Sequence, residues 1–298
     1  MATKATNTII VEDGFITCFN GVEITQRDLE NGYLNGENLV LRGEHLAGED
    51  LSDINLNGAD LRNTNLKGCN FTDAVLTNTN LSDCILSNCK FNDADLTEAF
   101  MAGASLANCD LTGAIFTGAD LRGVNLADTD ISVANIAGSN MSNADFSGQN
   151  LNGYDFSGCD LEEVNFAGAD LDGANFSDAF LQYSTFENAS LLKTNFKRAD
   201  LSDTRLRHAD MTGADLKGAN LINADMLDTK LINADLTGAQ LACTDFTDAD
   251  LTGANLTNAI VIDEVVKGNI TVKRMADFTG AKLDKAIFTG VDMAQLVF

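Results

Sequence analysis

The chain has 298 residues, no proline or tryptophan, and 44 acidic against 19 basic side chains, which gives a formal net charge of −25. Such a surface repels phosphates, so direct binding to nucleic acid is not expected. No apolar stretch approaches the length of a membrane-spanning helix, and the first 20 residues lack a signal-peptide core, so we expect a cytoplasmic protein without a membrane partner.

The N-terminal segment differs from the rest of the chain. Residues 1–23 are predicted to form an N-terminal cap, in which residues 8–22 make two strands around Glu12-Asp13-Gly14. From Ile24 to Leu39 a large apolar residue recurs every five positions, in a different phase from the repeats that follow. This change of phase predicts a bulge near residue 40.

A five-residue period dominates the middle of the chain. From Leu41 to Val261 every fifth residue is a large apolar side chain, over roughly 45 consecutive positions. Neither the 3.6-residue period of a helix nor the two-residue period of a strand produces this pattern. Chance cannot account for it, so the period must reflect the architecture.

Each pentad has a regular composition, as in Ala59-Asp60-Leu61-Arg62-Asn63. A small residue, a polar residue and a leucine or phenylalanine alternate in, out and in, which predicts a short extended segment. The next two residues turn a corner, and the second of them is often Gly, Asn or Asp, which tolerate a positive φ. Absence of proline fits a ladder of backbone hydrogen bonds between stacked segments.

The repeats resemble the pentapeptide-repeat family, whose motif A(D/N)LXX is matched by Ala119-Asp120-Leu121, Ala169-Asp170-Leu171 and Ala249-Asp250-Leu251. The resemblance implies an all-β fold, a right-handed quadrilateral parallel β-helix of about 11 to 13 coils with short terminal caps. Two spacings in the chain favour 20-residue coils. Cysteine recurs every 20 residues from Cys69 to Cys109, and phenylalanine alternates with leucine between residues 146 and 196.

The repeat region is predicted to cover residues 24–262, and the pattern then changes. Residues 263–275 are predicted to form a hairpin or insertion, either a recognition element or a spacer between coils. Residues 276–298 resume the period out of phase and predict a final coil with a C-terminal cap. Since residues 294–298 are mostly apolar and carry no charged side chain, homodimerisation through this end is also open.

The sequence contains no recognisable chemistry. His45 and His208 lie about eight coils apart in the four-sided arrangement, and no phosphate-binding loop, zinc spacing or nucleophile elbow is present. The cysteines at the inward small position are predicted to be buried thiols, because stacked parallel strands do not bring three sulfurs around one metal. We therefore expect no enzyme activity, no cofactor and no metal.

Acidic side chains gather between residues 141 and 190, a stretch without lysine or arginine. Inside it, Gln149 and Tyr154 occupy positions where a small residue is the rule, so we expect a local irregularity that either has no function or turns Tyr154 outward as an anchor. The predicted partner-binding residues are Asp145, Tyr154, Asp155, Asp160, Glu162, Glu163, Asp170, Asp172 and Asp178.

Three functions stay open on these grounds. The first is a non-catalytic rigid acidic rod that acts as an interaction or scaffold module for a protein with a basic surface or groove. The second follows from the resemblance, since some relatives inhibit DNA gyrase: mimicry of duplex DNA toward DNA gyrase or topoisomerase IV. The third is a structural assembly component or a host-directed effector.

Overall fold

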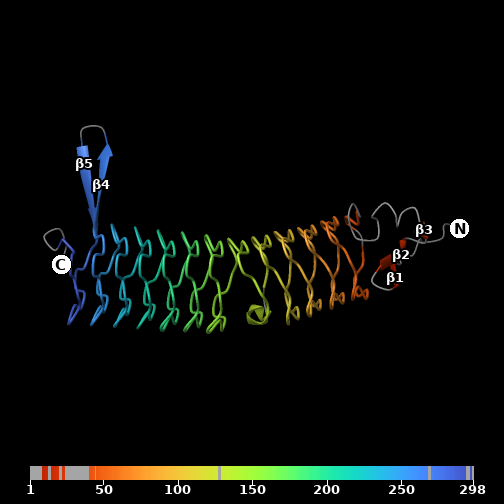
Figure 1. The fold of residues 1–298 in the computed structure, drawn as a ribbon, viewed down its shortest axis with the longest axis horizontal. Helices are drawn as coiled ribbons and strands as arrows, with labels where there is room; N and C mark the ends of the chain where they lie inside the picture. Colours follow the sequence, from red (N-terminus) through yellow and green to blue (C-terminus); the bar gives the residue numbers. More distant parts are fainter. Residues whose placement is uncertain are drawn as a thin grey trace. The chain divides into compact units, whose positions relative to one another are not determined.

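A computed structural model shows the fold in two compact units, Met1–Ala144 and Asp145–Phe298 (Figure 1). Each unit is built from stacked turns of the backbone, and its described residues contain almost no helix. The structure describes residues 9–12, 15–19, 22–23, 40–43, 45–126, 129–267, 270–292 and 296.

Parallel bridges between residues 20 apart define the coil in both units. In the first unit Val40 pairs with Asp60, and in the second Asp145 pairs with Asn165. These pairs confirm the 20-residue coil, in which four pentads form four sides. Each side makes three backbone hydrogen bonds with its neighbour, as where the amide groups of Leu56 and Gly58 donate to the next coil at 2.8 and 2.9 Å. A proline at such a position would remove a donor from the ladder.

Most of the described corners are tight turns closed by a hydrogen bond. The Ala59 amide donates to the carbonyl of Leu56 at 2.9 Å, and Gly58 has a φ of 70°, the pattern of a type II turn. Asn and Asp take the same conformation at many corners, as the sequence predicts. Larger residues are also forced into it, including His208 and Tyr183, with φ values of 59° and 61°.

The outward Asp or Asn of a pentad stabilises the corner that follows it. The side-chain oxygen of Asn70, for example, accepts from the amide of Thr72 at 3.2 Å. This bond satisfies the corner amide that the ladder leaves unpaired, which is the general role of an Asx turn. The frequency of Asp and Asn at this position is therefore partly a requirement of the fold.

The interior of the second unit contains two columns of stacked rings. Phe146 and Phe166 have centroids 5.3 Å apart with nearly parallel planes, and Phe156 and Phe176 repeat this arrangement at 4.9 Å. Rings of different columns meet edge to face, as Phe166 does with Phe176 at 5.6 Å. The prediction that like residues stack on like is confirmed, and this geometry is the one that aromatic pairs prefer.

Small inward residues complete the core and satisfy backbone groups. Thr64 and Cys84 are fully buried, and each donates to a carbonyl of the preceding coil, at 2.8 Å to Leu41 and at 2.9 Å to Leu61. A threonine or cysteine therefore fits the position that alanine usually fills, because its donor finds an acceptor in the wall.

The first unit also contains elements that are not regular coils. An antiparallel sheet has the order β1 (Ile9–Glu12), β2 (Phe15–Phe19) and β3 (Val22–Glu23). The short 3-10 helix η1 (Ile131–Val133) replaces a corner, and the side chain of Asp130 accepts from the Ser132 amide at its start. The predicted change of phase near residue 40 falls mainly on residues 24–39, outside the described residues, as do residues 294, 295, 297 and 298 of the C-terminal end.

A hairpin is inserted into one coil of the second unit. Strands β4 (Ile262–Lys267) and β5 (Ile270–Met275) pair antiparallel and stand away from the coils (blue in Figure 1). The coil pairing resumes after them: the spacing of bridged residues rises from 20 to 32, as between Asp250 and Lys282. The hairpin therefore adds 12 residues without ending the ladder, which explains the two-residue change of phase after Val261.

Candidate functional site

One side of the second unit carries two exposed aromatic residues. Asp160 and Phe180 are bridged across neighbouring coils, and Phe180 is bridged in turn to Asp200. Tyr183 lies at the corner that ends the same side, where its amide donates to the Ser202 carbonyl at 3.3 Å. Phe180 is 53% and Tyr183 57% exposed, although neighbouring positions on this side are polar. The ladder fixes the backbone beneath both rings, so their positions are set by the fold.

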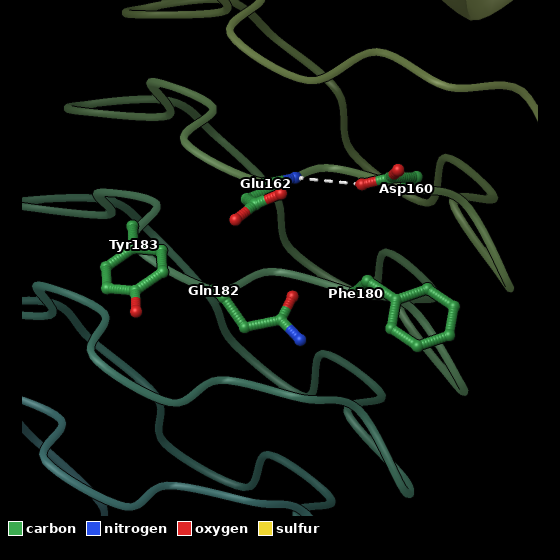
Figure 2. A pocket seen from close by; sticks show the side chains of 5 residues that line it. All are labelled: Asp160, Glu162, Phe180, Gln182 and Tyr183. Carbon is green, nitrogen blue, oxygen red and sulfur yellow. Dashed lines mark hydrogen bonds between the residues drawn. The ribbon is translucent and has the colours of Figure 1, made fainter.

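A hollow of about 490 Å³ lies between these rings and the preceding coil. We call it the Phe180 hollow; it is lined by Asp160, Glu162, Phe180, Gln182 and Tyr183. Figure 2 shows Gln182 between the two aromatic side chains, with Glu162 and Asp160 on the adjacent coil. The hollow combines two carboxylates, two ring faces and one amide group. Its lining contains no basic side chain.

Hydrogen bonds hold the polar part of the hollow in place. The Glu162 amide donates to Asp160 Oδ1 at 3.4 Å, the bond drawn in Figure 2. Gln182 donates through Nε2 to Asp200 Oδ2 at 2.9 Å, and the other oxygen of Asp200 accepts from Ser202. Asp200 is therefore engaged by its neighbours, whereas the Glu162 carboxylate forms no ion pair with a described residue.

The predicted partner-binding residues are spread over all four sides. Asp160 and Glu162 come together at the Phe180 hollow. Asp145 and Asp155 occupy two other sides, where each accepts from an asparagine of the next coil. Glu163 lies at a corner beside Tyr183 of the next coil. Asp170 and Asp172 lie on the fourth side, and Asp178 lies at a further corner. The structure therefore assembles only two of the predicted residues into one lined hollow.

Tyr154 is half-buried. Its ring meets the buried ring of Phe156 edge to face, with centroids 4.8 Å apart. The turn bond from the Tyr154 amide to the Leu151 carbonyl is kept at 3.1 Å, and the corresponding bond of Gln149 is 3.2 Å. The corner accepts the large side chain without losing its turn, so the tyrosine lies partly against the core.

Phe180, Gln182 and Tyr183 are not among the residues that the sequence analysis predicts to bind a partner. The signal that could have found the hollow is the 20-residue offset, which places Phe180 next to Asp160 and Gln182 next to Glu162. Applying that offset to every outward residue, rather than to apolar residues alone, brings the aromatic and acidic groups together.

Ion pairs divide the charged surface of the second unit into two regions. We name residues 145–190 the acidic coils and residues 193–250 the ion-paired coils. In the ion-paired coils lysine and arginine bridge successive coils; Lys217, for instance, lies 2.8 Å from Asp235. Among the described residues, none of the following forms an ion pair: Asp145, Asp155, Glu162, Glu163, Asp170 and Asp172.

Asp178 differs from the other predicted acids. Its two carboxylate oxygens accept from Arg198 Nε and Nη2 at 2.7 and 2.5 Å, a bidentate pair. Hydrogen bonding with Arg198, followed by the attraction of its charge, lowers the pKa of Asp178. The boundary between acidic and ion-paired coils therefore passes through this residue, which belongs to the paired group.

The described cysteines of the repeat are mostly buried and form no disulfide. Burial raises the pKa of the Cys69 and Cys84 thiols to about 11, so both are protonated at neutral pH. In the part of the chain that the structure describes, no three His, Cys, Asp or Glu side chains are grouped to hold a metal ion. Within the same residues, no helix is long and apolar enough to cross a bilayer.

Comparison with known protein families identifies the type of repeat. Sequence profiles described as pentapeptide repeats match in 8 copies, over residues 50–88, 169–207, 179–218, 199–238 and 229–261. A profile described as a pentapeptide repeat region matches residues 99–176. The comparison with curated proteins finds no match.

Solved structures with similarity to the chain include proteins described as pentapeptide repeat proteins. A trypsin-treated form of QnrB1, a plasmid-mediated fluoroquinolone resistance protein, is 19% identical, with 86% of this chain and 91% of that chain covered and a TM-score of 0.37. HetL, a pentapeptide repeat protein involved in heterocyst differentiation regulation from the cyanobacterium Nostoc sp. strain PCC 7120, is 24% identical, with 91% and 94% covered and a TM-score of 0.29.

A pentapeptide repeat protein from the Arabidopsis thaliana thylakoid lumen is 32% identical over 41% of this chain and 72% of that chain, with a TM-score of 0.15. The profile matches extend over more than half of the sequence and fall on the residues that form the 20-residue coils. The chain therefore belongs to the pentapeptide-repeat family and is built as a β-helical repeat protein.

Proposed function

We propose that the chain is a non-catalytic interaction module whose acidic coils bind a basic surface or groove of a protein partner. The observation that carries this proposal is the contrast in pairing. Carboxylates of the acidic coils, such as Asp155 and Asp170, have no cationic partner among the described residues, whereas most of the basic side chains that follow are paired with aspartates of neighbouring coils. The negative field of the acidic coils is therefore not cancelled locally, and it can attract a basic partner.

Rigidity supports the same role. Backbone hydrogen bonds of the acidic coils are short and continuous, as between the Leu171 amide and the Ser190 carbonyl at 2.8 Å. A surface held in this way loses little conformational entropy when it binds, so its charges act as a preorganised pattern.

The test compares two variants that lose the same charge. The first neutralises the acidic coils with Asp145→Asn, Asp155→Asn, Glu162→Gln and Asp170→Asn. The control neutralises four corners of the first unit with Asp53→Asn, Asp73→Asn, Asp83→Asn and Asp93→Asn, where Asn tolerates the positive φ. In affinity purification at low salt with quantitative mass spectrometry, we expect a partner that the wild type and control retain and the first variant loses. Equal recovery by all three proteins would reject the proposal.

A second candidate is mimicry of duplex DNA toward a type II topoisomerase, DNA gyrase or topoisomerase IV. The charge density of the acidic coils favours it. These coils span about 11 Å at the spacing of neighbouring strands, a length over which B-DNA carries about six or seven charges. The same stretch carries nine acidic side chains, of which Asp178 is paired with Arg198, namely Asp145, Asp155, Asp160, Glu162, Glu163, Asp170, Asp172, Asp178 and Glu187.

A supercoiling assay separates the two candidates. Inhibition of gyrase by the wild type and the control variant, but not by the variant with neutral acidic coils, is expected from a DNA mimic. Full supercoiling activity at a large molar excess of the wild type would dismiss the mimic and leave the general interaction module standing.

A further inference from the structure

The Phe180 hollow has features that a generally acidic surface does not require. Two large aromatic side chains, each more than half exposed, flank a depression whose other walls are carboxylates and an amide. Exposing the rings costs free energy through the hydrophobic effect, and most outward positions of the repeat are polar. A ligand that contacts both ring faces and carboxylates would recover this cost.

The chemistry of the lining selects a cation with a flat face. Aromatic rings attract cations over their faces, and arginine stacks on them while the N–H donors of its guanidinium point outward in the guanidinium plane, parallel to the ring. A carboxylate accepts those donors in pairs. Glu162 lies on the coil next to Tyr183 and Gln182, so one guanidinium can contact a ring and a carboxylate together (Figure 2).

Gln182 adds a directional element. Its Nε2 donates to Asp200 Oδ2 at 2.9 Å. This bond orients the amide plane and leaves the side-chain carbonyl as an acceptor. The hollow therefore offers acceptors and ring faces and no basic group of its own. A lysine ammonium could be attracted by the charge, but it lacks the planar fork that matches this arrangement.

Phe100 provides an internal comparison in the first unit. It fills the outward position of its pentad, as Phe180 does, and is exposed to a similar degree, 48%. Ala102 and Gly103 stand two and three positions after it, where Phe180 is followed by Gln182 and Tyr183. The preceding coil presents Asn80 and Ser82 to Phe100, without a carboxylate. Exposure of a phenylalanine alone therefore does not create a hollow of this chemistry.

We propose that the Phe180 hollow is the anchor point for an arginine side chain of the partner protein, with the guanidinium stacked on Tyr183 or Phe180 and hydrogen-bonded to Glu162. The inference rests on the proposed interaction function and names the group that the acidic coils recognise. The acidic coils attract the basic partner at long range, and the hollow fixes the register of the contact through one side chain.

The test uses three flexible Gly/Ser-rich peptides that are identical except for two positions, which carry arginine, lysine or the neutral isostere citrulline. Fluorescence anisotropy measures the Kd of each labelled peptide for the full chain. The ring variants are Phe180→Asn and Tyr183→Asn, because Asn is common at outward positions and tolerates the positive φ of the corner. Phe100→Asn is the matched control, and Glu162→Gln removes the carboxylate charge.

We expect the wild type to bind the arginine peptide about three- to tenfold more tightly than the lysine peptide, and the citrulline peptide most weakly. At least one of the two ring variants, and Glu162→Gln, should weaken binding of the arginine peptide by a similar factor and abolish the preference over lysine. Tyr183→Phe and Phe100→Asn should bind like the wild type.

Two results would overturn the inference in distinguishable ways. Equal binding of the arginine and lysine peptides, or unchanged binding by both ring variants, would show that charge alone attracts the peptide; the hollow would then be no anchor, although the acidic interaction surface would survive. Failure of both cationic peptides to bind the wild type at low salt would remove the hollow and the acidic surface together.

Discussion

The acidic coils and the ion-paired coils of the second unit share one ladder but differ inside and outside. Stacked phenylalanines alternate with leucine in the acidic coils, while leucine and methionine predominate in the ion-paired coils, as at Met211 and Leu216, with Phe196 and Phe246 as exceptions. Ladder bonds have the same length in both, 2.8 Å at Leu171 and 2.7 Å at Leu216. The fold therefore does not need ion pairs between coils. Carboxylates of the acidic coils that form no ion pair can contribute to binding a partner.

The largest expected effect tests the interior. Phe166 is fully buried and contacts rings of both columns, so Phe166→Ala should lower the free energy of unfolding by about 3–5 kcal/mol, as cavity-forming substitutions of phenylalanine do. Urea denaturation followed by circular dichroism measures this change.

Two further variants sharpen that measurement. Phe166→Leu places the residue of the ion-paired coils into the acidic coils and should recover most of the loss. Leu216→Ala gives the corresponding cost in the aliphatic interior. If Phe166→Ala proved milder than Leu216→Ala, the ring columns would not be the stronger of the two interiors.

A smaller effect is expected at Asp172, where the acidic coils use a carboxylate in a structural way. Its Oδ1 accepts from Ser190 Oγ at 2.6 Å and from the Leu192 amide at 3.0 Å. Because Ser190 replaces the usual Asp or Asn, the preceding coil supplies the acceptor that the corner amide needs. Asp172→Ala should cost about 1–2 kcal/mol in urea denaturation, the usual effect of leaving a half-buried donor unpaired.

Asp172→Asn is the matched control, since its amide oxygen can accept the same bonds. A loss of stability in Asp172→Asn equal to that in Asp172→Ala would mean that charge, rather than the acceptor, is what matters at this position.

The ion-paired coils should respond to acid through Asp235. Burial opposes ionisation of this residue, but hydrogen bonds from Lys217 and Thr237 outweigh it and lower its pKa from 3.8. A lowered pKa in the folded state means that the stabilisation is present above pH 3.8 and is lost as the pH falls through the lower value. Asp235→Asn should therefore cost at most about 1 kcal/mol at neutral pH and nothing at the acid end, since the pair is partly exposed.

Stability of the wild type and of Asp235→Asn, measured by urea denaturation between pH 2 and pH 7, checks this expectation. The two curves should converge on acidification. Parallel curves over the whole range would contradict a titrating contribution from Asp235.

The smallest effect has the opposite sign and belongs to the acidic coils. Asp155→Asn keeps an acceptor for Asn175, whose Nδ2 donates to Asp155 at 2.9 Å. The substitution removes the charge of a carboxylate that forms no ion pair with a described residue. We expect the thermal midpoint to rise by about one degree at low ionic strength and to match the wild type at high salt, because salt screens repulsion between exposed charges. A lower midpoint at low salt would indicate that the charge is locally stabilising.

Much of the fold follows from periodicity alone. The period of five and the residue types at the corners predict the turn with a positive φ, and the spacing of cysteine and phenylalanine predicts the 20-residue coil that the bridges confirm. These features are predictable because each depends on the composition of one pentad or on repetition of the same residue at a fixed distance.

The candidate site depends on different information. The Phe180 hollow arises from unlike residues on adjacent coils, and the acceptor role of Asp172 arises because a serine breaks the usual pattern one coil later. A single pentad gives no sign of either. Pairing between Lys217 and Asp235 is hidden for the same reason, since it depends on which rotamers bring two exposed side chains together.

The β4–β5 hairpin has a consequence for how such a chain can change. Twelve additional residues enter between Val261 and Ala276, and the amide of Ala276 still donates to the Val261 carbonyl at 2.9 Å, so the wall closes behind the excursion. A corner of the coil can therefore accept an inserted segment while the hydrogen-bonded coils on either side are kept. Natural variation and protein engineering can both exploit such points to install binding loops on an otherwise uniform wall.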